Sequence, residues 1–257
     1  MKPTGNTILI TGGGSGIGEA LAHRFHDLGN TVIVAGRRKD ALDRVVAGHA
    51  RMSAMPLDVE NADDIAAFAE QVTAAHPALN VLINNAGIMR SEVLDAQRDL
   101  GDAEATIATN LLGPIRMTNA LIDHLTRRGD GAIVNVSSGL GFVPLITAPT
   151  YSATKAAIHS YTIALREALR GRVEVIELVP PAVQTNLTPG QATRPGYQPL
   201  DAFMTEVMAL FAQEPTPPEI LVQRVGFQRF AEAENRFDQT LATMNAFVRR
   251  ARGGEPG

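Results

Sequence analysis

The sequence lacks several features that mark large classes of proteins. It contains no cysteine, which excludes a disulfide framework and any chemistry that depends on a thiol. No apolar run approaches the roughly 20 residues of a transmembrane helix, and no run of basic residues is longer than that from Arg37 to Lys39. The formal net charge is −4. We therefore expect neither a membrane nor a nucleic-acid partner.

The first residues also lack the apolar segment of a secretory signal. We therefore expect a cytoplasmic location. With 257 residues, 45% of them hydrophobic, the chain can bury one large core. No break in composition divides it, so we predict a single domain over residues 1–252 and a flexible tail over residues 253–257.

Glycine, in contrast, is concentrated near the N-terminus. It fills most positions between the apolar run Ile8–Ile10, which predicts a buried strand, and a helical pattern that begins at Glu19. Such a unit binds phosphate, because glycine lets the backbone approach the ligand and the helix N-terminus supplies free N–H groups. The glycine spacing differs from the usual G-x-G-x-x-G pattern. The predicted pyrophosphate site comprises Gly12, Gly14, Ser15, Gly16, Ile17 and Gly18.

The end of the second predicted strand, residues 31–35, indicates which dinucleotide is bound. In a dinucleotide-binding fold this position faces the adenosine ribose, where an acidic residue accepts a hydrogen bond from the 2′-hydroxyl. Here Gly36 stands in that place, and Arg37 and Arg38 follow it. Guanidinium groups match a 2′-phosphate. The pattern favours NADP(H), with a solvated basic turn as the alternative.

Apolar segments alternate with helical patterns along the rest of the chain. After the first strand, we predict strands at 31–35, 52–57, 80–87 with its exit loop, 131–138, 173–179 and 219–222. This alternation indicates an α/β, doubly wound, Rossmann-type parallel sheet of about seven strands with helices on both faces. Predicted helices include one capped by Asp40 that ends near Ala50, a long one at 99–128 interrupted at Gly113-Pro114, and a terminal one at 227–250. Residues 185–212 are predicted to form a substrate lid.

Further motifs accompany the glycine-rich loop that follows Thr11. They are Asn84-Asn-Ala-Gly87, Asn110, Ser138 and Tyr151-Ser-Ala-Thr-Lys155. In this order and spacing, over nearly the whole chain, the sequence resembles the classical short-chain dehydrogenases/reductases. Segments 136–144 and 179–183 are similar to the branch named for an oxidoreductase of D-alanine–teichoic-acid operons. The resemblance implies an oxidoreductase of the carbonyl reductase or alcohol dehydrogenase type.

The residues themselves suggest how such a reaction would proceed. Tyr151 and Lys155 are four residues apart, so both lie on one face of the helix predicted at 151–169. A free tyrosine has a pKa of about 10, and a neighbouring ammonium is expected to lower the pKa of Tyr151 by stabilising the phenolate. Tyr151 would then give a proton to a carbonyl oxygen or take one from an alcohol. Ser138 would hydrogen-bond the same oxygen.

The resemblance implies the remaining roles. Lys155 would also bind the ribose hydroxyls, and Asn110 would hold a water that links Lys155 to solvent. The implied cofactor contacts, besides the residues above and Tyr151 and Lys155, are Asp58, Val59, Asn85, Ala86, Gly87, Pro181, Val183 and Thr185. The predicted substrate pocket comprises Gly139, Phe142, Leu145 and Leu187, because the segment between Ser138 and Tyr151 must loop over the catalytic face. No fixed charge is evident there, which favours a largely apolar carbonyl or alcohol substrate.

Two alternatives stay open. One is a nucleotide-sensing, non-catalytic binding protein of the same fold, which would need no proton donor. Such a protein need not keep Asn110, Ser138, Tyr151 and Lys155 together, whereas this sequence contains all four, which favours the enzyme. Among enzymes, an imine reductase, steroid or sugar oxidation and ketoreduction on an acyl carrier fit the same motifs.

Metal binding and assembly complete the expectations. We predict no metal site, because His23 and His26 lack the partners typical of one. His159 is interpreted as helix packing or a subunit contact. Small residues on the helix predicted at 151–169 allow close helix approach, and the resemblance implies a homodimer or homotetramer.

Overall fold

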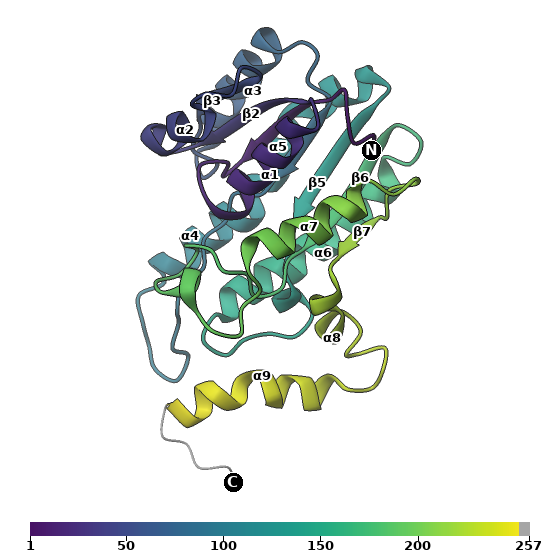
Figure 1. Ribbon diagram of the computed structural model, residues 1–257. Coiled ribbons are helices and arrows are strands. Elements are labelled where there is room, and N and C mark those ends of the chain that lie inside the picture. Colours follow the sequence, from purple (N-terminus) through teal and green to yellow (C-terminus); the bar gives the residue numbers. More distant parts are fainter. Residues whose placement is uncertain (252–257) are drawn as a thin grey trace.

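The computed structural model describes the backbone of residues 1–251 and the side chains of residues 1–246. The tail predicted at 253–257 lies outside the described residues. One sheet of seven parallel strands runs through the molecule in the order β3-β2-β1-β4-β5-β6-β7 (Figure 1). The strands are β1 Thr7–Thr11, β2 Thr31–Gly36, β3 Met52–Pro56, β4 Val81–Asn84, β5 Gly131–Val136, β6 Val173–Val179 and β7 Glu219–Leu221. The predicted doubly wound Rossmann-type fold is confirmed.

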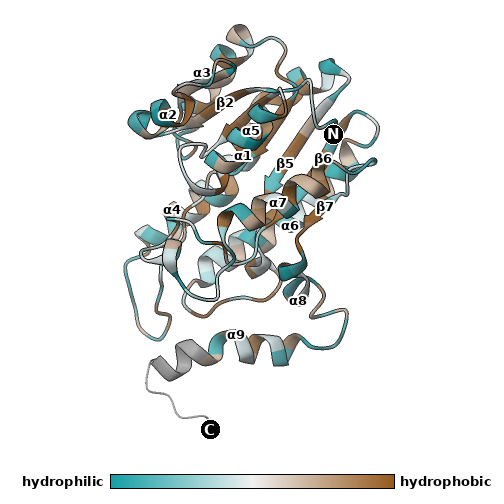
Figure 2. Ribbon diagram, viewed as in Figure 1, coloured by the Kyte–Doolittle hydropathy of each residue, from teal (hydrophilic) through white to brown (hydrophobic). Residues whose placement is uncertain are grey.

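Helices cover both faces of the sheet. They are α1 Gly16–Asp27, α2 Lys39–Val46, α3 Ala62–Ala75, α4 Gly101–Ile107, α5 Gly113–Arg128, α6 Pro149–Ala168, α7 Leu200–Phe211, α8 Gly226–Arg229 and α9 Phe237–Ala251. Successive strand residues point to opposite faces. Thus Ile8 and Ile10 join the apolar core under α1, α2 and α7, whereas Leu9 joins the core under α3 and α5. Figure 2 shows the strands as the most hydrophobic part of the chain.

The order of strands decides where a ligand can bind. β1 pairs with β2 on one side and with β4 on the other, so the chain reverses its direction of sheet growth between these two neighbours. In open parallel sheets, the crevice outside the carboxyl ends of the strands at such a reversal is the usual binding position. The loops after β1 and β4 both begin at this crevice.

Two helical predictions need correction. α2 begins at Lys39 and ends at Val46, so Asp40 lies in its first turn, where its charge favours the helix N-terminus, and the helix stops before Ala50. The terminal segment is two helices, α8 and α9, because the chain turns between Arg229 and Phe237. Asn235 in this turn has a φ of 54°, which a helix does not allow.

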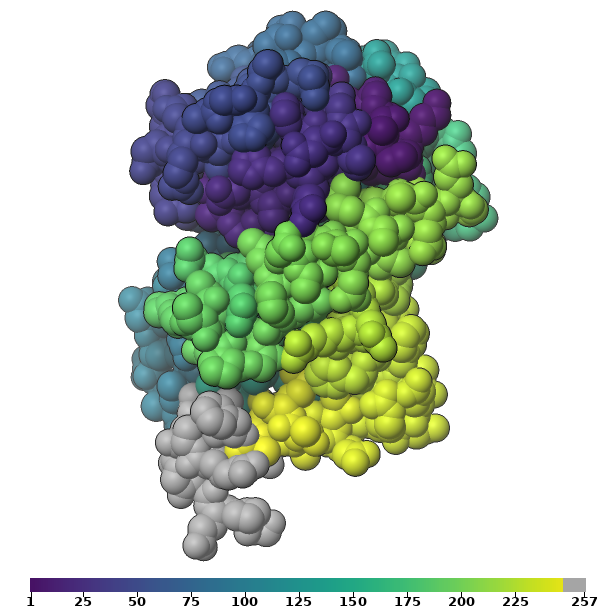
Figure 3. Space-filling view, viewed as in Figure 1, coloured from purple at the N-terminus to yellow at the C-terminus, as the bar shows by residue number. Residues whose placement is uncertain are grey.

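Helix α7 changes the extent of the predicted lid. Phe203, Val207 and Phe211, which share one face of α7, are fully or almost fully buried. Phe211 packs edge-on against Phe25 of α1, with ring centroids 5.5 Å apart. In Figure 3 the green segment that contains α7 is continuous with the body of the molecule. The apolar face of α7 therefore belongs to the core, and a lid function stays a prediction for the rest of residues 185–212.

The long helix predicted at 99–128 is interrupted earlier than expected. α4 passes into a π-helical turn, Ala108–Leu112, and this turn leads directly into α5, with Pro114 in the first turn. The interruption therefore lies at Asn110 rather than at Gly113-Pro114. Wider π-turns occur often at functional sites. Among the described residues, no helix has both the length and the apolar character needed to cross a bilayer.

Candidate active site

A cavity of about 500 Å³ opens at the carboxyl ends of β1, β2, β4, β5 and β6. It unites the glycine-rich loop at one end with Ser138, Tyr151 and Lys155 at the other. Most of the predicted cofactor contacts line it, namely Gly12, Gly14, Ser15, Gly16, Ile17, Arg37, Arg38, Val59, Asn85, Ala86, Gly87, Tyr151, Lys155, Pro181, Val183 and Thr185. The predicted pocket residue Leu187 lines it as well.

The glycine-rich loop is shaped by its contact with the loop after β4. A Cβ on Gly12 would lie 2.7 Å from the Cα of Ala86, and a Cβ on Gly18 would lie 2.4 Å from the carbonyl oxygen of Gly12. Thr11 Oγ1 accepts hydrogen bonds from the backbone N–H groups of Asn85 and Ala86, each at 3.1 Å. These contacts leave space for backbone only, so the N-terminus of α1 stays open towards the cavity, as phosphate binding requires.

Two basic side chains lie at the end of β2 in different environments. Arg37 forms an ion pair with Glu60 at 3.0 Å, and Glu60 also accepts a hydrogen bond from Thr109 Oγ1 at 2.7 Å. Arg38 reaches Ser15 Oγ at 3.5 Å and makes no ion pair within the described part of the chain. Arg38 is therefore the guanidinium available to an anion beside the glycine-rich loop. Glu60 had no distinguishing sequence pattern, because its partner is 23 residues away.

Helix α6 carries Tyr151 and Lys155 into the far end of the cavity. The residues are 7% and 4% exposed, and the Lys155 ammonium lies 5.6 Å from the centre of the Tyr151 ring. Lys155 Nζ donates a hydrogen bond to the carbonyl oxygen of Val136 at 2.8 Å. Ser138, two residues after β5, lines the same end of the cavity and is the side chain that lowers the pKa of Tyr151. The predicted trio thus converges on one point.

Burial controls the ionisation of this pair. It raises the pKa of Tyr151 to about 12, with the Ser138 hydrogen bond acting in the opposite direction. It also lowers the pKa of Lys155 to about 8. The prediction that the pKa of Tyr151 is lowered is therefore wrong for the protein alone, because desolvation of the phenolate is the largest effect and outweighs the Ser138 hydrogen bond. At neutral pH the tyrosine holds its proton and can donate it.

Asn110 supports the site from behind without lining the cavity. Its Oδ1 accepts from the N–H of Ile88 and its Nδ2 donates to the carbonyl oxygen of Ile88, both at 2.9 Å. A Cβ on Gly87 would meet Asn110 Oδ1 at 3.4 Å and Lys155 Nζ at 3.8 Å, so the three residues meet at one point. The π-helical turn therefore fixes the loop after β4 next to Lys155. The bridging water remains a prediction.

Some predicted residues lie outside the cavity lining. Gly18 is buried in the first turn of α1, and Asp58 accepts a hydrogen bond from the N–H of Glu60 instead of facing the cavity. Gly139 contacts Gln228, whose side chain occupies the space of a Cβ. The prediction that Phe142 lines the substrate pocket is wrong, because its ring packs edge-on against His159 with ring centroids 4.7 Å apart. Leu145 also lies outside the lining, and its N–H donates to Ser152 Oγ.

Other lining residues had escaped the sequence reasoning. Besides Glu60 and Thr109, they include Ile88, Arg90, Asn186 and Gln191. Gln191 is buried and donates to the carbonyl oxygen of Val183 at 2.8 Å and to Thr185 Oγ1 at 3.1 Å. It holds the strand exit that carries two predicted cofactor contacts. A lone glutamine in a Pro- and Thr-rich loop gave no signal for this role.

Comparison with known proteins agrees with this geometry. Residues 6–195 match the family model described as short chain dehydrogenase. The chain belongs to the short-chain dehydrogenase/reductase family. It is 41% identical over 189 residues to an uncharacterized oxidoreductase, DltE, of Bacillus subtilis. The aligned region covers 73% of this chain and 75% of the Bacillus protein.

Solved structures extend the family likeness to the C-terminal part. A short-chain dehydrogenase from Burkholderia cenocepacia in complex with NADP is 26% identical, with a TM-score of 0.79. The superposition covers 95% of this chain and 98% of the Burkholderia chain. A 3-ketoacyl-(acyl-carrier-protein) reductase from Brucella melitensis complexed with NADH is 27% identical, covers 82% and 92% of the two chains, and has a TM-score of 0.74. This short-chain dehydrogenase/reductase is thus an oxidoreductase by family, and its backbone cradle at Gly12 and Gly18 fits a dinucleotide.

Proposed function

We propose that this protein is an NADP(H)-dependent oxidoreductase that interconverts a carbonyl compound and an alcohol, with Tyr151 as the proton donor and acceptor. The observation that carries the proposal is the convergence of Ser138, Tyr151 and Lys155 at one end of a cavity whose other end is the glycine-rich loop. The nicotinamide, when bound, supplies or accepts the hydride.

Each side chain has a role in this reaction. The buried Tyr151 hydroxyl, protonated at neutral pH, gives its proton to the substrate oxygen during reduction. Ser138 donates a hydrogen bond to the same oxygen and stabilises the charge that develops there. The Lys155 ammonium, fixed by Val136, stabilises the phenolate left behind and binds the cofactor ribose. Asn110 holds the loop that carries Gly87 against Lys155.

The cofactor preference follows from the environment of Arg38. Arg38 and Ser15 lie together beside the glycine-rich loop, and no acidic residue stands at Gly36. A charge-assisted contact to a 2′-phosphate contributes about 1.5–3 kcal/mol, which is about 10- to 100-fold in affinity. Arg37 contributes less, because Glu60 already neutralises it. The NADP complex of the Burkholderia relative is consistent with this choice.

The substrate is proposed to be a small, largely apolar carbonyl compound or alcohol. Apolar side chains that line the cavity include those of Pro180, Pro181, Val183, Leu187 and Ile88. These side chains offer no charge to a substrate. Imine reduction would use the same proton donor, and a nucleotide-sensing protein would bind the cofactor without turnover.

One set of measurements tests the proposal. A panel of ketones, alcohols and imines is assayed with NADPH and NADH at the nicotinamide absorbance, for the unmodified protein, Tyr151→Phe and the control Tyr161→Phe on the same helix. Tyr151→Phe should lower kcat by about 10²–10⁴ and leave NADPH affinity unchanged, while the control retains activity. Near-normal kcat in Tyr151→Phe, where chemistry limits the rate, would contradict the role of Tyr151. Arg38→Ala should weaken NADPH binding by about 10- to 100-fold without changing NADH binding, and tighter binding of NADH by the unmodified protein would refute the cofactor choice.

A further inference from the structure

A row of polar side chains crosses the sheet beneath the catalytic helix. Asn84, Asn135, Glu177 and Glu219 stand in register on the neighbouring strands β4, β5, β6 and β7. Asn84 Nδ2 donates to Asn135 Oδ1 at 2.9 Å, and Asn135 in turn donates to Thr162 of α6 at 3.0 Å. The first two members of the row are neutral, whereas the last two carry carboxylates.

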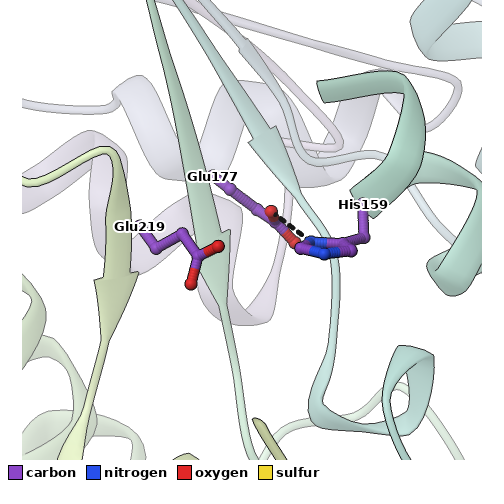
Figure 4. Close-up of side chains that lie close together, drawn as sticks. All are labelled: His159, Glu177 and Glu219. Carbon is purple, nitrogen blue, oxygen red and sulfur yellow. Dashed lines mark hydrogen bonds and ion pairs between the residues drawn. The ribbon is translucent and has the colours of Figure 1, made fainter. Parts of the chain in front are cut away.

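Glu177 is the fully buried carboxylate of the row. It is 0% exposed, and His159 Nδ1 of α6 lies 2.7 Å from its Oε2 (Figure 4). Its other oxygen, Oε1, has no hydrogen-bond partner among the described residues. A buried carboxylate with one bonded oxygen is costly, and a nearby positive charge reduces this cost.

Together with Glu219, the His159–Glu177 pair forms a cluster that has the composition of a metal site. Ligand atoms of His159, Glu177 and Glu219 lie within 4.8 Å of one another. However, Arg229 of α8 already holds both oxygens of Glu219, with Nε 2.8 Å from one and a terminal nitrogen 3.0 Å from the other. A guanidinium in that position repels a metal ion and occupies its ligand. The cluster is therefore an arrangement of internal charges.

Lys155 is a buried positive charge on which Glu177 acts. Tyr151, Lys155 and His159 follow one another at intervals of four on α6, so they form one column facing the sheet. Lys155 donates a hydrogen bond to the carbonyl oxygen of Val136, which follows Asn135 in the sequence. Asn135 is the member of the polar row that lies opposite Glu177. Burial lowers the pKa of Lys155, and the negative charge of Glu177 acts in the opposite direction. The ammonium and the carboxylate thus share one buried layer.

The charged groups that face this layer come from every element packed around it. They are Lys155 and His159 from α6, Glu177 from β6, Glu219 from β7 and Arg229 from α8. Glu219 pairs with Arg229, and the charge of Glu177 acts on both Arg229 and Lys155. His159 fixes the orientation of the carboxylate through the contact of its Nδ1 with Glu177 Oε2.

We propose that Glu177, oriented by His159, is a positioning residue that keeps the buried Lys155 ammonium charged at neutral pH. Glu177 touches neither the cavity nor the substrate, and it acts only through Lys155. The consequence for catalysis rests on the proposed function, in which Lys155 must be charged to stabilise the Tyr151 phenolate. The effect on Lys155 itself can be measured without any substrate.

The chain offers an unusually direct measurement. Lys2, Lys39 and Lys155 are its lysines, so protein labelled with ¹³C at lysine Cε gives few NMR signals, and the signal absent from Lys155→Met identifies Lys155. In Glu177→Gln the pKa of Lys155 should fall by about one unit, while the signals of Lys2 and Lys39 titrate as before. The matched control is Glu174→Gln, which removes an exposed carboxylate from the same strand. It should leave Lys155 unchanged.

The outcomes separate cleanly. An unchanged or raised pKa of Lys155 in folded Glu177→Gln, judged by far-UV circular dichroism, overturns the proposal. If this variant fails to fold, Glu177→Met removes the charge together with the unpartnered Oε1, at the cost of the contact with His159 Nδ1, and the same fall is expected. A fall in pKa without any activity on the substrate panel would support the role of Glu177 while the proposed function fails. In an active enzyme, the pH profile of kcat should shift with the pKa of Lys155 in Glu177→Gln and return with Glu177→Asp.

Discussion

The burial of Lys155 should make the protein less stable than it would be without this charge. Lys155 is 4% exposed, and its pKa falls from 10.5 to about 8 on folding. Since each pKa unit corresponds to about 1.4 kcal/mol, the buried ammonium lowers the free energy of unfolding by roughly 3 kcal/mol at neutral pH. Lys155→Met removes the charge and keeps the length of the side chain. Loss of the hydrogen bond to Val136 offsets about 1 kcal/mol of the gain.

The expected net result is a variant about 2 kcal/mol more stable than the unmodified protein at neutral pH. The sign of the pH dependence gives an independent check. A lysine whose folded pKa is depressed destabilises the fold fully below the folded pKa of about 8, and the penalty fades as the pH rises towards 10.5. Unfolding of the unmodified protein should therefore cost about 2 kcal/mol more at about pH 9.5 than at about pH 7.

The measurement is urea unfolding followed by circular dichroism, because the sequence contains no tryptophan for fluorescence. The pH must stay below 10, since the raised pKa of Tyr151 makes folded protein lose stability above its unfolded value of 10.0. Protein concentration is held fixed in case subunits associate. The control is Lys39→Met, at an exposed lysine that pairs with Asp43. If Lys155→Met is less stable at neutral pH and the unmodified protein shows no gain towards higher pH, the reasoning from burial is refuted.

Three further predictions follow from packing. Gly18→Ala should abolish measurable NADPH binding, because its Cβ would meet the Gly12 carbonyl oxygen at 2.4 Å, whereas Gly14→Ala, with its nearest contact at 3.3 Å, should bind within about tenfold of normal; equal titration curves for both would contradict the cradle. Asn245→Ala should lower the free energy of unfolding by about 2 kcal/mol, because the buried amide accepts from Ile146 N–H and donates to the Pro144 carbonyl oxygen, and the control Thr243→Ala should lower it less. The protein should form a homodimer or homotetramer through α4, α5 and α6, where Ile107 and Ile163 are exposed; a 27.4 kDa particle in light scattering at micromolar concentration would argue against this.

The sequence determined the fold because its signals are local. Apolar runs such as Ile8–Ile10 can form buried strands whatever surrounds them, and the glycines after Thr11 permit one kind of strand-to-helix turn. The spacing of Tyr151 and Lys155 likewise puts both on one helix face without knowledge of the neighbours. Ser138 could be added because it ends a predicted strand. These inferences needed only periodicity and backbone geometry.

Tertiary structure decided what each side chain meets. Phe142 follows Ser138 closely, yet its ring turns to His159 and Arg229 instead of the cavity. Likewise, the apolar face of α7 could have been a lid or core, and contact with α1 made it core. Periodicity shows that a face is apolar, but the partner that covers it is set by how distant elements pack.

The charges show the same division most clearly. The sequence supplied Arg37 and His159, but Glu60 and Glu177 became their partners only through contacts between distant residues. The direction of the pKa shift of Tyr151 also depended on the fold, because the sequence shows a neighbouring lysine and cannot show the degree of burial. Desolvation depends on every atom around a group, so only the packed structure determines which of two opposing effects is larger.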